Sequence, residues 1–157
     1  MQAFRRGFEQ LLEWVVILLM VTLAVVVTAG VAFRYSGYSL VWYDEVASIL
    51  LAWVTYYGAA LAALKRAHIG VPELVKMLPP APRLAVAVFA EACVFAFFAL
   101  LAWTGYSVLE ILSTDMMVSI PEVSARFTNS VIPIGAALFI LARALALPET
   151  LREARAA

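Results

Sequence analysis

The sequence predicts an all-α integral membrane protein with four transmembrane helices, and three observations lead there. Of its 157 residues, 65% are hydrophobic and only 14% are charged, whereas soluble domains are nearer half apolar and a quarter charged. The mean hydropathy is +0.95, more apolar character than one core of this size can hide. Four charge-free runs approach the roughly 20 residues that a helix needs to cross a bilayer. The formal net charge of zero gives no reason to expect a nucleic-acid partner.

The charge-free runs cover residues 14–33, 46–64, 92–109 and 127–142. We place the spans at approximately 11–33, 46–64, 84–109 and 129–147, which requires Glu91 to be tolerated in the third span and Arg143 to reach the membrane surface from the fourth. Pro133 and Gly135 interrupt the start of the fourth span. No connection reaches 25 residues, so we expect residues 1–157 to form a single four-helix membrane domain. The first run is longer than the core of a cleavable signal peptide, which is about 7 to 15 residues, and we expect a permanent anchor.

The distribution of basic residues predicts the orientation of the chain. Nine of the eleven lysines and arginines lie near the two termini or in the second connection. Lysine and arginine concentrate in cytoplasmic segments. Both termini and the second connection are therefore expected in the cytoplasm, and the first and third connections outside. Within the second connection, "VPELVKMLPP" predicts a short helix lying on the membrane surface, with Pro72 at its start and Pro79–Pro80 at its end.

The only histidine and the only cysteine give no sign of a metal or cofactor site. His68 follows Lys65 and Arg66 and has no cysteine near it, whereas metal sites need several converging ligands. We expect His68 to have an architectural role at the membrane surface rather than a catalytic one. Cys93 cannot form an internal disulfide, and we expect a small buried apolar side chain there. We predict no cofactor, no metal and no catalytic residue.

Acidic residues gather on the predicted outer side. Asp44 and Glu45 lie at the start of the second span, where the positive end of the helix dipole favours acids. Further acids lie in or beside the third connection. We predict an acidic outer surface that could dock a partner, formed by Asp44, Glu45, Glu110, Asp115 and Glu122. Tyr35 and Trp42 fit an interfacial aromatic belt, for which simple anchoring is the favoured interpretation.

Glu91 is the acid predicted farthest from the ends of its span. A carboxylate in the membrane is costly, and by default it suggests a function. It could carry a proton in a small homo-oligomeric exporter. It could equally be neutral, hydrogen-bonded to another subunit, or directed toward the cytoplasmic surface. One copy of the chain has too few intramembrane polar groups for a substrate pathway, which favours an accessory subunit or an oligomer.

The order of the remaining motifs resembles the DctQ-like family, the small membrane subunits of tripartite ATP-independent periplasmic (TRAP) transporters. Arg34–Tyr35 ends the first span, and "SLVWYDE" follows with Trp42, Asp44 and Glu45. The stretch "LAWVTYYGAALAALKRAHIGV" then contains Trp53, Gly58 and His68, and "VIPIGAALFIL" contains Pro133 and Gly135. Each piece alone is weak, but their order and spacing are specific, and the resemblance covers nearly the whole chain. Glu91 maps onto no motif of the family.

The resemblance implies a non-catalytic subunit of the bacterial inner membrane. Its expected partners are a large multi-spanning subunit that transports by an elevator-like motion, a periplasmic solute-binding protein and membrane lipids. The implied role is to scaffold the large subunit and to help dock the binding protein, for sodium-coupled uptake of an organic acid. The exporter that uses Glu91 is the alternative.

Overall fold

The computed structural model of the protein describes residues 2–67 and 79–156, and within these ranges it is helical. The helices are α1 (Gln2–Tyr35), α2 (Tyr43–Leu64), α4 (Pro80–Ile111), α5 (Ala125–Asn129) and α6 (Val131–Ala156), with a 3-10 turn η1 (Leu112–Thr114) after α4. Four segments are long and apolar enough to cross a membrane, namely 4–35, 43–64, 82–114 and 125–150. This agrees with the predicted all-helical class. His68 and most of the expected interfacial helix fall in 68–78, outside the described residues. The two prolines expected at its end are described, with Pro79 just before α4 and Pro80 as its first residue.

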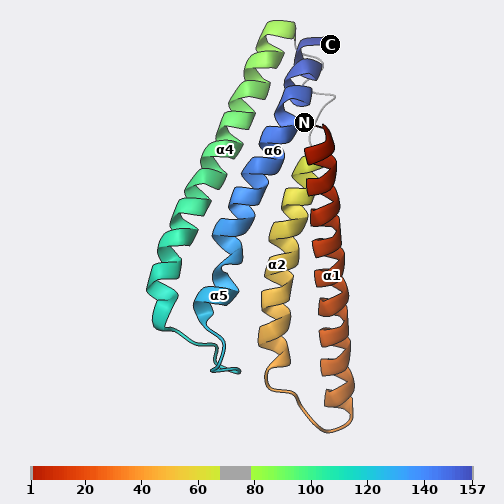
Figure 1. Cartoon of the computed structure of the whole chain (residues 1–157), viewed down its shortest axis with the longest axis vertical. Helices are drawn as coiled ribbons and strands as arrows, with labels where there is room; N and C mark the ends of the chain where they lie inside the picture. The colour runs from red at the N-terminus through yellow and green to blue at the C-terminus, as the bar shows by residue number, and fades with distance from the viewer. Residues whose placement is uncertain (1, 68–78, 157) are drawn as a thin grey trace.

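The four long helices form an open row rather than a closed bundle (Figure 1). Helix α2 packs against α1 on one side and against α6 on the other, and α6 packs in turn against α4. The spatial order is therefore α1, α2, α6, α4. Helices α1 and α4 form the edges of the row, and each has one principal neighbour. The two chain ends lie at one end of the row, called here the terminal end. The α1–α2 and α4–α5 connections lie at the other, called here the loop end.

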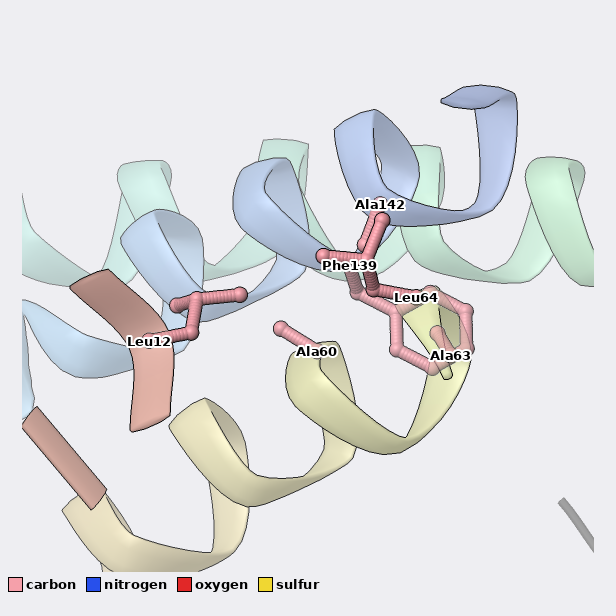
Figure 2. Packing of buried hydrophobic residues seen from close by; sticks show 6 residues of the cluster. All are labelled: Leu12, Ala60, Ala63, Leu64, Phe139 and Ala142. Atoms are coloured by element: carbon pink, nitrogen blue, oxygen red, sulfur yellow. The ribbon is translucent and has the colours of Figure 1, made fainter. Parts of the chain in front are cut away.

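Small side chains let the central helices approach closely. Ala60 and Ala63 of α2 and Ala142 of α6 are fully buried, in a cluster with Leu12, Leu64 and Phe139 (Figure 2). Small residues at helix contacts allow the backbones to meet, which is how membrane helices gain packing energy without a hydrophobic drive between them. Phe139 also stacks on Phe98 of α4, with ring centroids 3.6 Å apart. This cluster joins all four long helices.

Two glycines mark the closest contacts of α6 with its neighbours. A β-carbon added at Gly135 would lie 2.6 Å from Cβ of Tyr56 on α2. A β-carbon added at Gly105 of α4 would lie 2.8 Å from a methyl carbon of Ile132. Both distances are too short for any other residue without movement of the helices. The motif glycine Gly135 therefore has a packing reason in this fold.

Near its start, the fourth apolar segment (125–150) is interrupted at Ser130, between α5 and α6. This is three residues before Pro133, where the sequence predicts an interruption. Ser124 caps α5, its Oγ accepting a hydrogen bond from the Arg126 amide at 3.2 Å. Helix α6 then begins at Val131, so Pro133 lies in the first turn, where its missing N–H is not needed. At its other end α6 continues through Pro148, past the expected end of the span at residue 147.

The expectation that Cys93 is buried is wrong. Its side chain is exposed, because α4 packs principally on α6 and leaves much of its circumference without a neighbour from the described chain. Low polarity alone could not distinguish a buried position from one that faces lipid.

Candidate protein interface

The loop end brings together the first and third connections, where the sequence predicts an acidic surface. The third connection folds back on itself between α4 and α5. The Met117 amide donates to the Val123 carbonyl at 2.9 Å, and the Ala125 amide donates to the Asp115 carbonyl at 2.9 Å. These bonds turn the connection into a compact hairpin-like loop that extends toward α2 (Figure 1).

Glu45 joins this loop to the start of α2. Its carboxylate accepts hydrogen bonds from the backbone amides of Val118 at 3.2 Å and Ser119 at 2.7 Å. The Ser119 hydroxyl lies 3.5 Å from the Val41 carbonyl, just before α2. Two amides on one carboxylate form a charge-assisted pair that fixes direction as well as distance. Glu45 is half-buried, and each of its two carboxylate oxygens accepts a hydrogen bond from within the chain.

Trp53, eight residues after Glu45 on α2, makes a second connection to this end of the fourth segment. Its indole Nε1 donates to the Thr128 carbonyl at 3.0 Å, and its ring contacts Phe127 with centroids 5.6 Å apart. The Thr128 carbonyl lies beside the break between α5 and α6, where helical bonding is interrupted. The family-motif tryptophan therefore supplies a hydrogen bond that the broken helix cannot supply itself.

The remaining acids of the predicted surface point away from the chain. Unlike Glu45, the side chains of four of these acids are exposed, namely Asp44, Glu110, Asp115 and Glu122. Asp115 also contributes its backbone carbonyl to the loop. The structure thus divides the predicted docking set into one internal acid and four exposed ones. Asp115 and Glu122 lie on the third connection, Asp44 lies in the first turn of α2, and Glu110 lies in the last turn of α4.

The other motif residues have simpler surroundings. Arg34 and Tyr35 are exposed at the end of α1. Trp42 is the residue that precedes the first turn of α2. A β-carbon added at Gly58 would meet no atom within 4 Å, in contrast to Gly135. Packing within this chain gives no reason for Gly58.

Glu91 is paired within the chain. Arg143 of α6 donates from Nε to Oε2 of Glu91 at 2.8 Å and from Nη2 to Oε1, forming a bidentate ion pair. Glu91 is 6% exposed. A carboxylate held this way by a guanidinium is a structural ion pair rather than the unpaired acid that the exporter hypothesis needs.

Further ion pairs lie at the terminal end. Lys65 pairs with Glu13 and, at 3.8 Å, with Glu9. The hydrogen bond that the Lys65 ammonium donates to Glu13 is the largest cause of its raised pKa. Desolvation opposes this shift, and the negative charges of Glu13 and Glu9 add to it. Arg5 pairs with Glu149. In the described ranges no cluster of three or more histidine, cysteine or acidic side chains could hold a metal.

Sequence reasoning missed the partners of these residues. Arg143 binds Glu91, which is 52 residues away along the chain. The amides of Val118 and Ser119 have no side-chain signature. One signal was available for the ion pair, since both Glu91 and Arg143 end charge-free runs of similar length.

Comparison with known proteins adds an independent finding. The sequence model of the family described as "Tripartite ATP-independent periplasmic transporters, DctQ component" matches residues 23–153. The match begins inside α1 and ends inside α6, and it includes the loop end, Trp53, Glu91 and Arg143. Comparison with curated proteins gives no match.

Proposed function

Because the chain belongs to the DctQ component family of TRAP transporters, we propose that it is the static scaffold that holds the large transport subunit in the bilayer. It is the small membrane subunit of such a transporter and not an enzyme. The scaffold role, the docking role and the orientation described below are our proposals.

The open row is the observation that carries the scaffold role. The chain exposes 10364 Å², whereas a compact soluble monomer of 17.1 kDa exposes about 7,800 Å². A wide row with two unpartnered faces and two edges offers surface both to lipid and to a large multi-spanning partner. Ion pairs and buried alanines join neighbouring helices of the row, which suits a part that stays still while another part moves.

The loop end supports a docking role toward the periplasmic solute-binding protein. Glu45 holds the third connection against α2. Two exposed acids, Asp115 and Glu122, then project from this loop, and two more, Asp44 and Glu110, lie at the adjoining helix ends. Charged groups arranged in this way mainly steer encounter and orientation of a partner. The transported solute in this proposal is an organic acid, delivered by the binding protein, and the coupling to sodium resides in the large subunit.

The orientation follows from the basic residues. The whole chain forms one unit in the bacterial inner membrane, with the terminal end in the cytoplasm and the loop end in the periplasm. Arg5, Arg6, Lys65, Arg83 and Arg152 lie toward the terminal end, as the positive-inside rule requires.

Reversing the exposed acids tests the docking role. Glu110→Lys, Asp115→Lys and Glu122→Lys are combined in one variant, and uptake is measured in proteoliposomes at increasing concentrations of binding protein. The concentration that gives half-maximal uptake should rise severalfold, with little change at saturation. Arg152→Glu, which reverses an exposed charge at the other end, is the matched control and should behave as wild type. Identical binding-protein dependence in the triple variant would remove the docking role and leave the scaffold role standing.

A further inference from the structure

We infer that the hydrocarbon layer ends at one shared level on the terminal side, marked by Glu13, Lys65, Glu91 and Arg143. Beyond this level α1, α4 and α6 continue into the headgroup layer and the water as a projection. The partner at this level is the charged and polar headgroup surface of the bilayer. This inference needs only that the chain spans a membrane, so it stands apart from the scaffold and docking roles.

The first argument is the length of each helix between its charged ends. Counting along the chain, Glu13 and Arg34 are 21 residues apart, Glu45 and Lys65 are 20, Glu91 and Glu110 are 19, and Arg126 and Arg143 are 17. At 1.5 Å per residue these separations are about 25 to 32 Å. The hydrocarbon core of a bilayer is about 30 Å thick. All four segments therefore carry an apolar length that matches one bilayer.

The second argument is that the structure places the four terminal-side charges in two contacting pairs. Lys65 of α2 pairs with Glu13 of α1, and Arg143 of α6 pairs with Glu91 of α4. The ends of the four apolar lengths thus coincide pairwise on neighbouring helices. Sequence counting alone could not establish this, because each helix could slide against the next.

The third argument concerns what happens just past this level. Helix α2 ends at Leu64, and the chain turns at Arg66 with φ of 56°. Arg5 of α1 then reaches across the end of α2. Its Nη2 lies 3.4 Å from the Leu64 carbonyl, and it pairs with Glu149 of α6. Helices α1 and α6 are separated by α2 within the row, so they meet here because α2 has ended.

The projection consists of residues 2–12 of α1, 80–90 of α4 and 144–156 of α6. These segments are 11 to 13 residues long, or about 16 to 20 Å at the helical rise. An alternative position for the edge of the hydrocarbon layer is Arg83, eight residues closer than Glu91 to the start of α4. It would place two ion pairs in hydrocarbon, where charged side chains are costly, and it would leave α2 too short to reach it. Glu91 is therefore a residue of the membrane boundary.

Cysteine accessibility along α4 separates the two boundaries. Val86 and Phe97 lie three helical turns apart on the same face of α4, and both are exposed, at 45% and 59%. Val86 lies on the projecting side of Glu91 and Phe97 on the membrane side. In a Cys93→Ala background, single cysteines replace Val86 or Phe97 in the whole transporter. Val88 is 49% exposed on the opposite face of α4 and gives a third variant. A helix of a partner subunit could shield Val86 or Val88 from the reagent, but one helix could not shield both.

Inside-out vesicles are treated with a membrane-impermeant maleimide, and detergent-solubilised samples confirm that each cysteine can react. We expect Val86→Cys or Val88→Cys to react at least tenfold faster than Phe97→Cys. Protection of all three would overturn the inference and place the boundary at Arg83. Fast reaction of Phe97→Cys would also overturn it. If Val86→Cys or Val88→Cys reacted in right-side-out vesicles but not in inside-out ones, the boundary at Glu91 would stand and the proposed orientation would be wrong.

Discussion

The two ends of the helix row are held by different bonds. At the loop end, side chains bind backbone groups, with Glu45 accepting from two amides and Trp53 donating to the Thr128 carbonyl. At the terminal end, charged side chains bind one another, in pairs between Arg5 and Glu149, Lys65 and Glu13, and Arg143 and Glu91. Backbone partners suit a loop whose shape must be fixed. Paired charges suit helices that must keep a common level at the membrane surface.

The difference leaves each end with a different surface. The loop end uses one acid internally and exposes four, so its surface carries excess negative charge. At the terminal end, Glu9, Glu13, Glu91 and Glu149 pair with basic side chains. Among the side chains that the structure describes, the exposed acids outside these pairs lie at the loop end, which can offer negative charge to a soluble partner.

Breaking the Glu91–Arg143 pair should have the largest effect. Glu91→Ala leaves the Arg143 guanidinium without its partner, and removal of one member of a buried ion pair costs about 3 kcal/mol or more. Thermal unfolding of the purified chain, followed by intrinsic fluorescence, should show a clear fall in Tm. The exchanged double variant, Glu91→Arg with Arg143→Glu, should recover part of the loss. A single variant as stable as wild type would show that the pair does not hold α4 to α6.

Removing Glu45 should have the next largest effect and should act at the loop end. Glu45→Ala leaves the amides of Val118 and Ser119 without their acceptor, which should loosen the third connection from α2. Hydrogen exchange should accelerate at these two amides. Asp44→Ala is the matched control, since Asp44 is exposed and adjacent, and it should leave their exchange unchanged. Equal exchange in both variants would contradict the role given to Glu45.

Trp53→Phe should cost less, because it keeps most of the aromatic contact and removes one hydrogen bond. We expect a loss of about 1 kcal/mol, seen as a small fall in Tm. Combined with Glu45→Ala, its effect should be close to additive, since the two residues bind different segments. Strong coupling between them would show that the loop and the α5–α6 break act as one unit.

The Lys65–Glu13 pair should have the smallest effect and a distinct pH dependence. The pKa of Lys65 is raised from 10.5, so its contribution to stability is complete at neutral pH and is lost only as pH rises through the raised value. The difference in Tm between wild type and Lys65→Gln should stay constant from pH 6 to 9 and shrink at more alkaline pH. A difference that already shrinks below pH 9 would contradict the pairing.

The sequence was sufficient to predict the four helices, because long charge-free runs dictate them. It was also sufficient to recognise the family, because "SLVWYDE" and "VIPIGA" keep their order and spacing. It could not predict the row. The neighbours of α6 are determined by contacts such as Gly135 with Tyr56, between residues far apart in the chain. The same limit hid the partner of Glu91 and the internal role of Glu45, since a carboxylate bound to backbone amides looks like any other acid.

Uptake by reconstituted components tests the scaffold role most directly. Proteoliposomes would contain this chain alone, the large subunit alone, or both, each supplied with the binding protein and an organic acid under a sodium gradient. We predict uptake only when both membrane subunits are present. Uptake by this chain alone, or undiminished uptake by the large subunit without it, would contradict the scaffold role.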